Sequence, residues 1–225
     1  MIIPIFSKGD LNRKRNRPGT LYWHGDISQK KVALTFDDGP NEPYTSEILN
    51  ILKKYDVRAT FFMIGKNIQI YPEAAKAVAE GGNIIGNHSY SHPNLIFDLD
   101  PKVRRQIKSA EGEIINKAGI KPYLFRPPYG GDDPLTLLQA KKLGYVVVKW
   151  SVSSKDWEKP GVEKIVKNVL NHVENGSIIL MHDGDQMHHG GDRSQTVDAL
   201  PVIITELRKQ GYELVTVPEL LGLNK

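Results

Sequence analysis

Two adjacent aspartates follow an apolar, strand-like run in the segment KVALTFDDGP, residues 31–40. Placing Asp37 beside Asp38 is costly, because each negative charge makes the other carboxyl harder to ionise. A bound cation offsets this repulsion with its own positive charge. Taken alone, DDGP is more often an ordinary turn than a site. If a cation is bound, one carboxylate binds the ion and the other is free to act as a base.

Two histidines supply a second type of donor that such a site uses. The segment HSYSH places His88 and His92 four residues apart, which puts both imidazoles on one face if the segment is helical. The nearby Gly86 and Pro93 limit any such helix to about one turn. Two neutral imidazoles and one carboxylate, with open positions for water and substrate, form a standard arrangement for metal-assisted hydrolysis.

The strands and helices that must position these residues can be predicted from apolar runs that recur along the chain. Seven short runs are rich in branched and aromatic residues, as buried strands are: KVALTF, ATFFMI, NIIGN, YLFRP, YVVVKW, SIILMH and YELVTV. Helix-like segments, such as 45–55 and 101–118, lie between most of them. This alternation predicts an α/β protein with parallel strands, either a closed barrel or an open doubly wound sheet. We favour a barrel of seven strands over one of eight.

The unusual polar clusters all fall at the end of one of these runs or directly after it. They are DDGP, HSYSH, RPPYG, SVSSKDW and HDG. In parallel α/β proteins the carboxyl ends of the strands share one face, so clusters that are distant in sequence converge there. That face is the predicted active site.

Length and composition bound the classes of function. The chain of 225 residues fits one large domain, and no shift in composition suggests a second. Thirty basic and 26 acidic residues give a net charge of +4, too mild and too scattered to indicate nucleic-acid binding. The one dense basic run, residues 12–19, reads as a solvated tail. The absence of cysteine excludes disulfides and thiolate chemistry.

Five motifs in order, TFDDGP, HSYSH, RPPYG, DW and LMHDG, resemble the polysaccharide deacetylases of carbohydrate esterase family 4, the NodB homology domain. The resemblance covers residues 31 to about 221. It implies a distorted, TIM-like seven-stranded (β/α) barrel and removal of N-acetyl groups from a peptidoglycan-like or chitin-like polysaccharide. It also implies one divalent ion, usually Zn²⁺, with Co²⁺, Ni²⁺ and Mn²⁺ as alternatives. We place the deacetylase domain at residues 31–222, after a partly irregular N-terminal extension at residues 1–30.

The resemblance also assigns roles to the metal side of the site. It makes Asp38, His88 and His92 the metal ligands and Asp37 the catalytic base. Arg126, from RPPYG, would hold Asp37.

Further roles concern the substrate and the leaving group. The resemblance assigns the backbone N–H of Tyr129 to the oxyanion and His182 to protonation of the leaving amine. Trp157 and Leu180 would wall a small pocket for the acetyl methyl, and Pro128 would also contact substrate.

One position departs from the family pattern. An aspartate commonly stands four residues before the tryptophan and orients the acid histidine, but here that position is Ser153. A missing carboxylate partner predicts a weaker or less well-aimed acid at His182. This leaves two alternatives open: an O-acetyl glycan esterase, whose leaving group needs less help, and a weakly active or non-catalytic glycan-binding relative.

The remaining expectations concern partners and location. We expect an N-acetylated glycan as substrate, no nucleic acid, no transmembrane segment and a monomer. No apolar run approaches the length of a membrane span, and MIIPIF is too short for the core of a secretory leader. The protein would act at the cell surface or outside the cell if a leader was removed, and in the cytoplasm otherwise.

Overall fold

The strands of this protein form a single parallel sheet. The computed structural model describes residues 19–98 and 100–223, and within them nine strands pair in the order β1-β6-β5-β4-β3-β2-β8-β7, with β9 paired to β2 beside this path. The strands are β1 (Leu21–Tyr22), β2 (Lys31–Asp37), β3 (Thr60–Met63), β4 (Ile84–Asn87), β5 (Leu124–Phe125), β6 (Val146–Val148), β7 (Val152–Ser153), β8 (Ile178–His182) and β9 (Glu213–Leu214).

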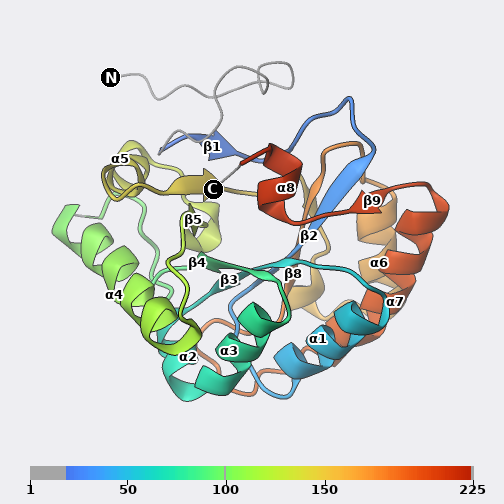
Figure 1. Cartoon of the computed structure of the whole chain (residues 1–225), viewed down its shortest axis with the longest axis horizontal. Helices are drawn as coiled ribbons and strands as arrows, with labels where there is room; N and C mark the ends of the chain where they lie inside the picture. Colours follow the sequence, from blue (N-terminus) through green and yellow to red (C-terminus); the bar gives the residue numbers. More distant parts are fainter. Residues whose placement is uncertain (1–18, 99, 224–225) are drawn as a thin grey trace.

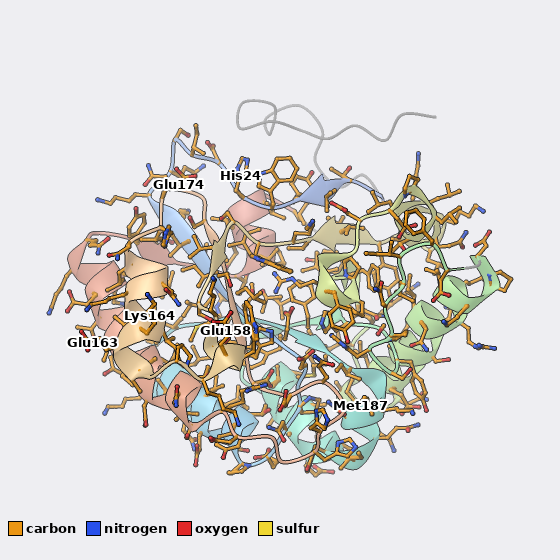
Figure 2. All side chains as sticks on the ribbon, turned by 180° about the vertical axis from the view of Figure 1, so that it is seen from behind. His24, Glu158, Glu163, Lys164, Glu174 and Met187 are labelled. Atoms are coloured by element: carbon orange, nitrogen blue, oxygen red, sulfur yellow. The ribbon has the colours of Figure 1, made fainter. Side chains whose placement is uncertain are left out.

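The α-helices of the described residues are α1 (Tyr44–Lys54), α2 (Gly65–Ile70), α3 (Pro72–Glu80), α4 (Asp100–Ala118), α5 (Pro134–Lys142), α6 (Val162–Leu170), α7 (Ser194–Lys209) and α8 (Val217–Leu221). Helices α1 to α7 follow one another around the outside of the curled sheet, whereas α8 packs against its other face, with Ala33, Phe62 and Ile178 (Figure 1). Each of the longer ones buries one face. In α6, Ile165 and Val169 are buried, whereas Glu163 and Lys164 are exposed on the same helix (Figure 2). No helix in the described part of the chain is long and apolar enough to cross a membrane.

Strand β2 pairs with three strands, β3, β8 and β9, and sets the position of the site. Every residue of β2 except Lys31 is buried, as expected for a parallel strand covered on both faces. Its register places Asp37 beside Phe62 of β3 and beside His182 of β8. Two residues needed for chemistry thus lie at the same level, at the carboxyl ends of neighbouring strands.

The predicted α/β barrel is confirmed, but the number of strands differs from the seven expected. All seven apolar runs contain a strand. The sheet gains β1 and β7, which have two residues each and are too short to stand out as apolar runs. Strand β9 pairs with the start of β2, at Lys31 and Val32, instead of extending the main path. Strand β1 brings part of the predicted N-terminal extension into the sheet. The basic run 12–19 lies outside the described residues except for Gly19.

The barrel is open along one seam. Strands β1 and β7 are the two ends of the strand order and do not pair with each other in the part of the chain that the structure describes. An isolated antiparallel bridge between His24 and Ser177 links the segment after β1 to the start of β8. His24 is buried, and its Nδ1 lies 2.7 Å from the carbonyl oxygen of Gly25 (Figure 2). This histidine is therefore a structural residue at the end of β8 opposite to the active-site pocket.

Candidate active site

A pocket of about 400 Å³ opens at the carboxyl ends of the strands, on the face that the sequence predicts. Its lining residues come from the ends of strands β2 and β8 and from loops that follow strands: Asp37, Asp38, His88, His92, Pro127, Tyr129, Trp150, Trp157, Leu180, His182, Asp185, Gln186 and Arg193. Acidic, imidazole and aromatic side chains thus share one cavity.

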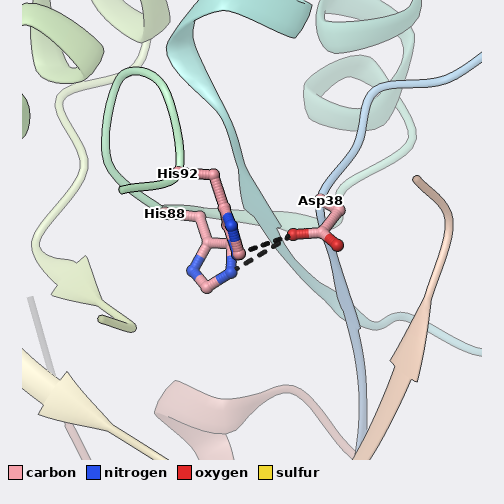
Figure 3. A group of neighbouring side chains, drawn as sticks. All are labelled: Asp38, His88 and His92. Carbon is pink, nitrogen blue, oxygen red and sulfur yellow. Dashed lines mark ion pairs between the residues drawn. The ribbon is translucent and has the colours of Figure 1, made fainter. Parts of the chain in front are cut away.

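The three predicted metal ligands meet at one point of this pocket. Oδ1 of Asp38 lies 3.4 Å from Nε2 of His88 and 3.2 Å from Nε2 of His92, and all three residues are buried (Figure 3). The donor atoms lie within 4.8 Å of one another. Oδ1 of Asp38 is also a buried acceptor without a hydrogen-bond partner among the described residues. One carboxylate and two imidazoles that converge in this way fit a divalent ion.

The orientation and charge of the imidazoles also suit metal binding. Nδ1 of His88 donates to the carbonyl oxygen of Arg126 at 2.6 Å, which directs Nε2 into the site. Burial and the neighbouring charge of His88 lower the pKa of His92 to about 4, so this ring is neutral and offers a lone pair. Burial also lowers the pKa of His88, but Asp37 and Asp38 outweigh burial and raise it, so binding of an ion there would release the proton of His88. Burial opposes ionisation of Asp38, but the three histidines around it outweigh burial and hold its pKa well below the usual range.

The segment that carries the two histidines is a loop and not the helical turn considered from the i, i+4 spacing. The backbone φ is 68° at Ser89 and 54° at His92, in the left-handed region. Ser89 supports this conformation because its Oγ accepts the N–H of His92 at 3.1 Å. The two rings are nevertheless adjacent, with centroids 5.0 Å apart. A loop therefore achieves what the spacing suggested for a helix.

Asp37 faces a different partner from its neighbour. Its Oδ1 accepts from Nη1 of Arg126 at 2.6 Å, as the sequence predicts. Arg126 is fully buried and also donates to Oγ1 of Thr35 and to the carbonyl oxygens of Val148 and Lys149. The guanidinium lies 4.0 Å from the ring centre of Phe62. Asp37 is thus fixed by a charged hydrogen bond, whereas Asp38 is turned toward the imidazoles.

His182 has a carboxylate partner, which corrects the expectation drawn from Ser153. Nδ1 of His182 lies 2.8 Å from Oδ1 of Asp156, and the backbone N–H of His182 donates to Oδ2 of Asp156 at 2.7 Å. Asp156 also accepts from Ser154 and Thr196. Oγ of Ser153, by contrast, is buried without a hydrogen-bond partner in the described ranges. The residue next to Trp157 therefore does what the absent aspartate was expected to do.

This pairing sets the protonation of His182. Burial alone would lower the pKa of His182, but the charge of Asp156 and its hydrogen bond outweigh burial and raise the pKa to about 9. Burial works against ionisation of Asp156 too, and the charge of His182 still lowers its pKa. At neutral pH the pair is a carboxylate with an imidazolium.

The predicted substrate contacts are placed as follows. Trp157 and Leu180 line the pocket, and the Trp157 ring meets His182 edge-on with centroids 5.3 Å apart. Tyr129 has φ 58° and packs its ring on His92 at 4.7 Å. Pro128 is buried in the turn after β5, and its neighbour Pro127 lines the pocket in its place.

Two further residues, Asn67 and Gln186, form hydrogen bonds to Asp38, and no sequence motif predicts this role for either of them. The backbone N–H of Gln186 donates to Oδ2 of Asp38 at 3.0 Å. The buried side chain of Asn67 donates to the carbonyl oxygens of Asp38 and Gln186 at 2.7 and 2.9 Å. A lone amide in the first turn of a helix gives no signal of such a role in a single sequence.

Comparison with known proteins agrees with this site and fold. Residues 24–148 match the family model described as "Polysaccharide deacetylase". A peptidoglycan-N-acetylglucosamine deacetylase of Bacillus cereus is 42% identical over 94% of this chain and 98% of its own length. The peptidoglycan-N-acetylmuramic acid deacetylase PdaC of Bacillus subtilis is 40% identical over 89% of this chain, which spans 40% of PdaC.

A solved structure shows the same architecture. The Bc1960 peptidoglycan N-acetylglucosamine deacetylase, in complex with 4-naphthalen-1-yl-N-oxidanyl-benzamide, superposes with a TM-score of 0.86. It is 38% identical to this chain, and the match covers 91% of this chain and 94% of that one. The site and the fold thus agree with those of deacetylases. The chain belongs to the polysaccharide deacetylase family.

Proposed function

We propose that this protein is a metal-dependent deacetylase that removes N-acetyl groups from an amino-sugar polysaccharide, and that this polysaccharide is peptidoglycan. The observation that carries the proposal is the convergence in one pocket of the Asp38, His88 and His92 triad, the clamped carboxylate of Asp37 and the Asp156–His182 pair. The similarity to deacetylases of peptidoglycan N-acetylglucosamine and N-acetylmuramic acid supports this substrate class.

The residues of the chain divide the work of amide hydrolysis. Asp37 accepts the proton of the attacking water, while Arg126 holds its carboxylate in place through a hydrogen bond. His182 holds a proton at neutral pH and gives it to the leaving nitrogen, since an amine leaves poorly without protonation. The backbone N–H of Tyr129 would donate to the oxyanion, where loss of one donor typically costs about 10²-fold to 10³-fold in rate.

Asp38, His88 and His92 would hold the divalent ion, for which Zn²⁺ is our proposal. When bound, such an ion polarises the amide carbonyl and lowers the pKa of the water that attacks it.

The experiment uses defined glycans and mass spectrometry. Full-length protein, treated with a chelator and then loaded with Zn²⁺, is incubated with N-acetylated peptidoglycan fragments, with chitin oligomers and with O-acetylated xylan fragments. We expect a loss of one acetyl group (42 Da) per sugar from an N-acetylated substrate with Zn²⁺ and none without it. Release of acetate from the O-acetylated substrate alone would overturn the proposal.

The alternatives of an O-acetyl esterase or a non-catalytic relative lose their main support. Both rested on a missing partner for His182, and Asp156 fills that place. In the described residues, nothing at the site favours an ester over an amide.

A further inference from the structure

The loop between the two ligand histidines is held by a side chain of α4, the next helix along the chain, as well as by the backbone N–H groups of Gly65 and Lys66, which donate to the carbonyl oxygens of Ser89 and Tyr90. Oε1 of Gln106, on α4, accepts the backbone N–H groups of both Tyr90 and Ser91 at 3.0 Å. Nε2 of Gln106 donates to Oγ of Ser91 at 2.9 Å. One amide therefore makes three hydrogen bonds to the two residues directly before His92.

This attachment matters because the loop has an unfavourable backbone. Ser89 and His92 both have positive φ, a conformation that residues other than glycine rarely adopt and that persists only when the surroundings enforce it. The N–H groups of Tyr90 and Ser91 lie between these two positions. Fixing them fixes the direction in which His88 and His92 leave the backbone.

Helix α4 is itself well placed to act as the fixed point. Val103, Ile107 and Ala110 are fully buried and lock the helix face that flanks Gln106. Nδ2 of Asn87, at the end of β4, donates to the carbonyl oxygen of Ile107 at 2.9 Å. The helix is therefore joined to both ends of the loop, through Asn87 before His88 and through Gln106 before His92.

We propose that Gln106 is a positioning residue for the metal site, which holds the backbone of Tyr90 and Ser91 so that Nε2 of His88 and of His92 converge on Asp38. This inference rests on the proposed function, because it assumes that the triad binds a metal ion. Side chains that hydrogen-bond a metal ligand directly typically contribute about 10-fold to 100-fold in metal affinity, and we take this range for Gln106, which holds the two residues next to a ligand.

The test measures Zn²⁺ affinity by competition with a chromophoric chelator, using full-length protein stripped of metal. Gln106→Leu removes all three hydrogen bonds at similar volume, and we expect its Kd for Zn²⁺ to rise about 10-fold to 100-fold. Gln106→Glu keeps an oxygen that accepts both N–H groups and the hydroxyl proton of Ser91, so we expect an affinity near the wild-type value. A near-wild-type Zn²⁺ affinity in Gln106→Glu, together with a loss in Gln106→Leu, would show that the hydrogen bonds of Gln106, and not its packing, support the site.

Gln195→Leu is the matched control, because Oε1 of Gln195 also accepts a backbone N–H, that of Gly161 at 2.7 Å, and Gln195 is likewise partly buried. We expect this variant to lower the melting temperature without changing the Zn²⁺ affinity.

Wild-type Zn²⁺ affinity in Gln106→Leu would overturn the inference. If that variant does not fold, Gln106→Ala carries the same expectation, since alanine favours the helix. A wild-type protein without Zn²⁺ affinity would instead refute the metal site itself.

Discussion

Asp37 and Asp38 are neighbours in sequence, yet each carboxylate has its own set of partners. Asp37 is clamped by Arg126, which offers donors but no acceptor. Asp38 points one oxygen at two imidazoles and the other at the N–H of Gln186. The repulsion between the two adjacent carboxylates is offset by the guanidinium of Arg126 beside Asp37. Beside Asp38 it would be offset by a bound cation.

The first prediction separates these two roles. Asp37→Asn should keep one divalent ion per chain but lose most of the deacetylation rate, because it removes the base and not a ligand. His92→Ala should lose tight metal binding and activity together. Elemental analysis and acetate release measure the two effects. Loss of metal in Asp37→Asn with retention in His92→Ala would show that the assignments are reversed.

The second prediction concerns the acid. Asp156→Asn removes the charge that raises the pKa of His182 from 6.5 to about 9, so in metal-free protein this pKa should fall toward or below 6.5. At neutral pH the imidazole then lacks its proton, and the amide rate should drop about 10²-fold or more. NMR titration of labelled histidine and a pH–rate profile measure both effects. Ser153→Ala is the control and should change neither, because Oγ of Ser153 has no partner in the described structure.

The same pair makes stability depend on pH. The pKa of His182 in the folded protein lies above the ordinary value of 6.5, so the ion pair with Asp156 stabilises fully below pH 6.5. This contribution is lost as the pH rises through about 9. In urea unfolding of the metal-free protein, the difference in free energy of unfolding between wild type and Asp156→Asn should therefore shrink between these pH values. A difference that grows with pH would contradict this account.

At the scale of elements, the site depends on how closely the ends of β2 and β8 approach. A Cβ atom on Gly184 would lie 2.2 Å from the carbonyl oxygen of Asp38 and 2.9 Å from the N of Gly39. Both are backbone atoms, so the two strand ends would have to separate. The loop after β8 thus packs directly against the backbone of Asp38, one of the proposed metal ligands.

The third prediction follows from this packing. Gly184→Ala should destabilise the protein by about 1–3 kcal/mol, as overpacking does, and should also weaken Zn²⁺ binding. Gly112→Ala, in the middle of α4, is the control: a Cβ there meets nothing within 4 Å among the described residues. It should stabilise by about 0.5–1 kcal/mol and leave Zn²⁺ binding unchanged. Chemical unfolding and zinc titration of both variants provide the comparison.

The strands also show which parts of the fold could be predicted from the sequence and which could not. Apolar runs revealed seven of the nine strands, because burial on both faces of a parallel sheet demands continuous apolar residues. Strands β5 and β9 have only two residues each, but the apolar residues beside them lengthen the run enough to be seen. Strand β7 has only Val152 and Ser153, and no periodicity exists over two residues. The partner of His182 was missed for a related reason. Ser153 and Asp156 both follow the same strand-like run, and only the turn between them decides which side chain reaches the imidazole.

At the scale of the whole molecule, the proposed metal binding would be coupled to folding, since the three proposed ligands come from distant parts of the chain. Asp38 follows β2, and His88 and His92 follow β4. An unfolded chain does not hold these residues together, so an ion that binds the folded state stabilises it.

The fourth prediction measures this coupling. Zn²⁺ at about 100 times its Kd should raise the free energy of unfolding by about 2.7 kcal/mol, and a chelator should reverse the gain. Thermal unfolding with Zn²⁺ and with chelator gives the shift in Tm. His92→Ala should show no shift under either condition. An equal shift in that variant would place the stabilising ion elsewhere.

The fully buried Arg126 has a consequence for how such a protein can change over evolutionary time. Its guanidinium bonds to β2 through Thr35 and Asp37 and to the backbone at the end of β6, and it rests on Phe62 of β3. The same side chain therefore orients the base and fills the interior of the barrel. A descendant that abandons the chemistry cannot simply discard this residue, because doing so leaves a hole and unpaired carbonyl groups in its core. Inactive descendants should thus lose the triad first and retain the arginine longest.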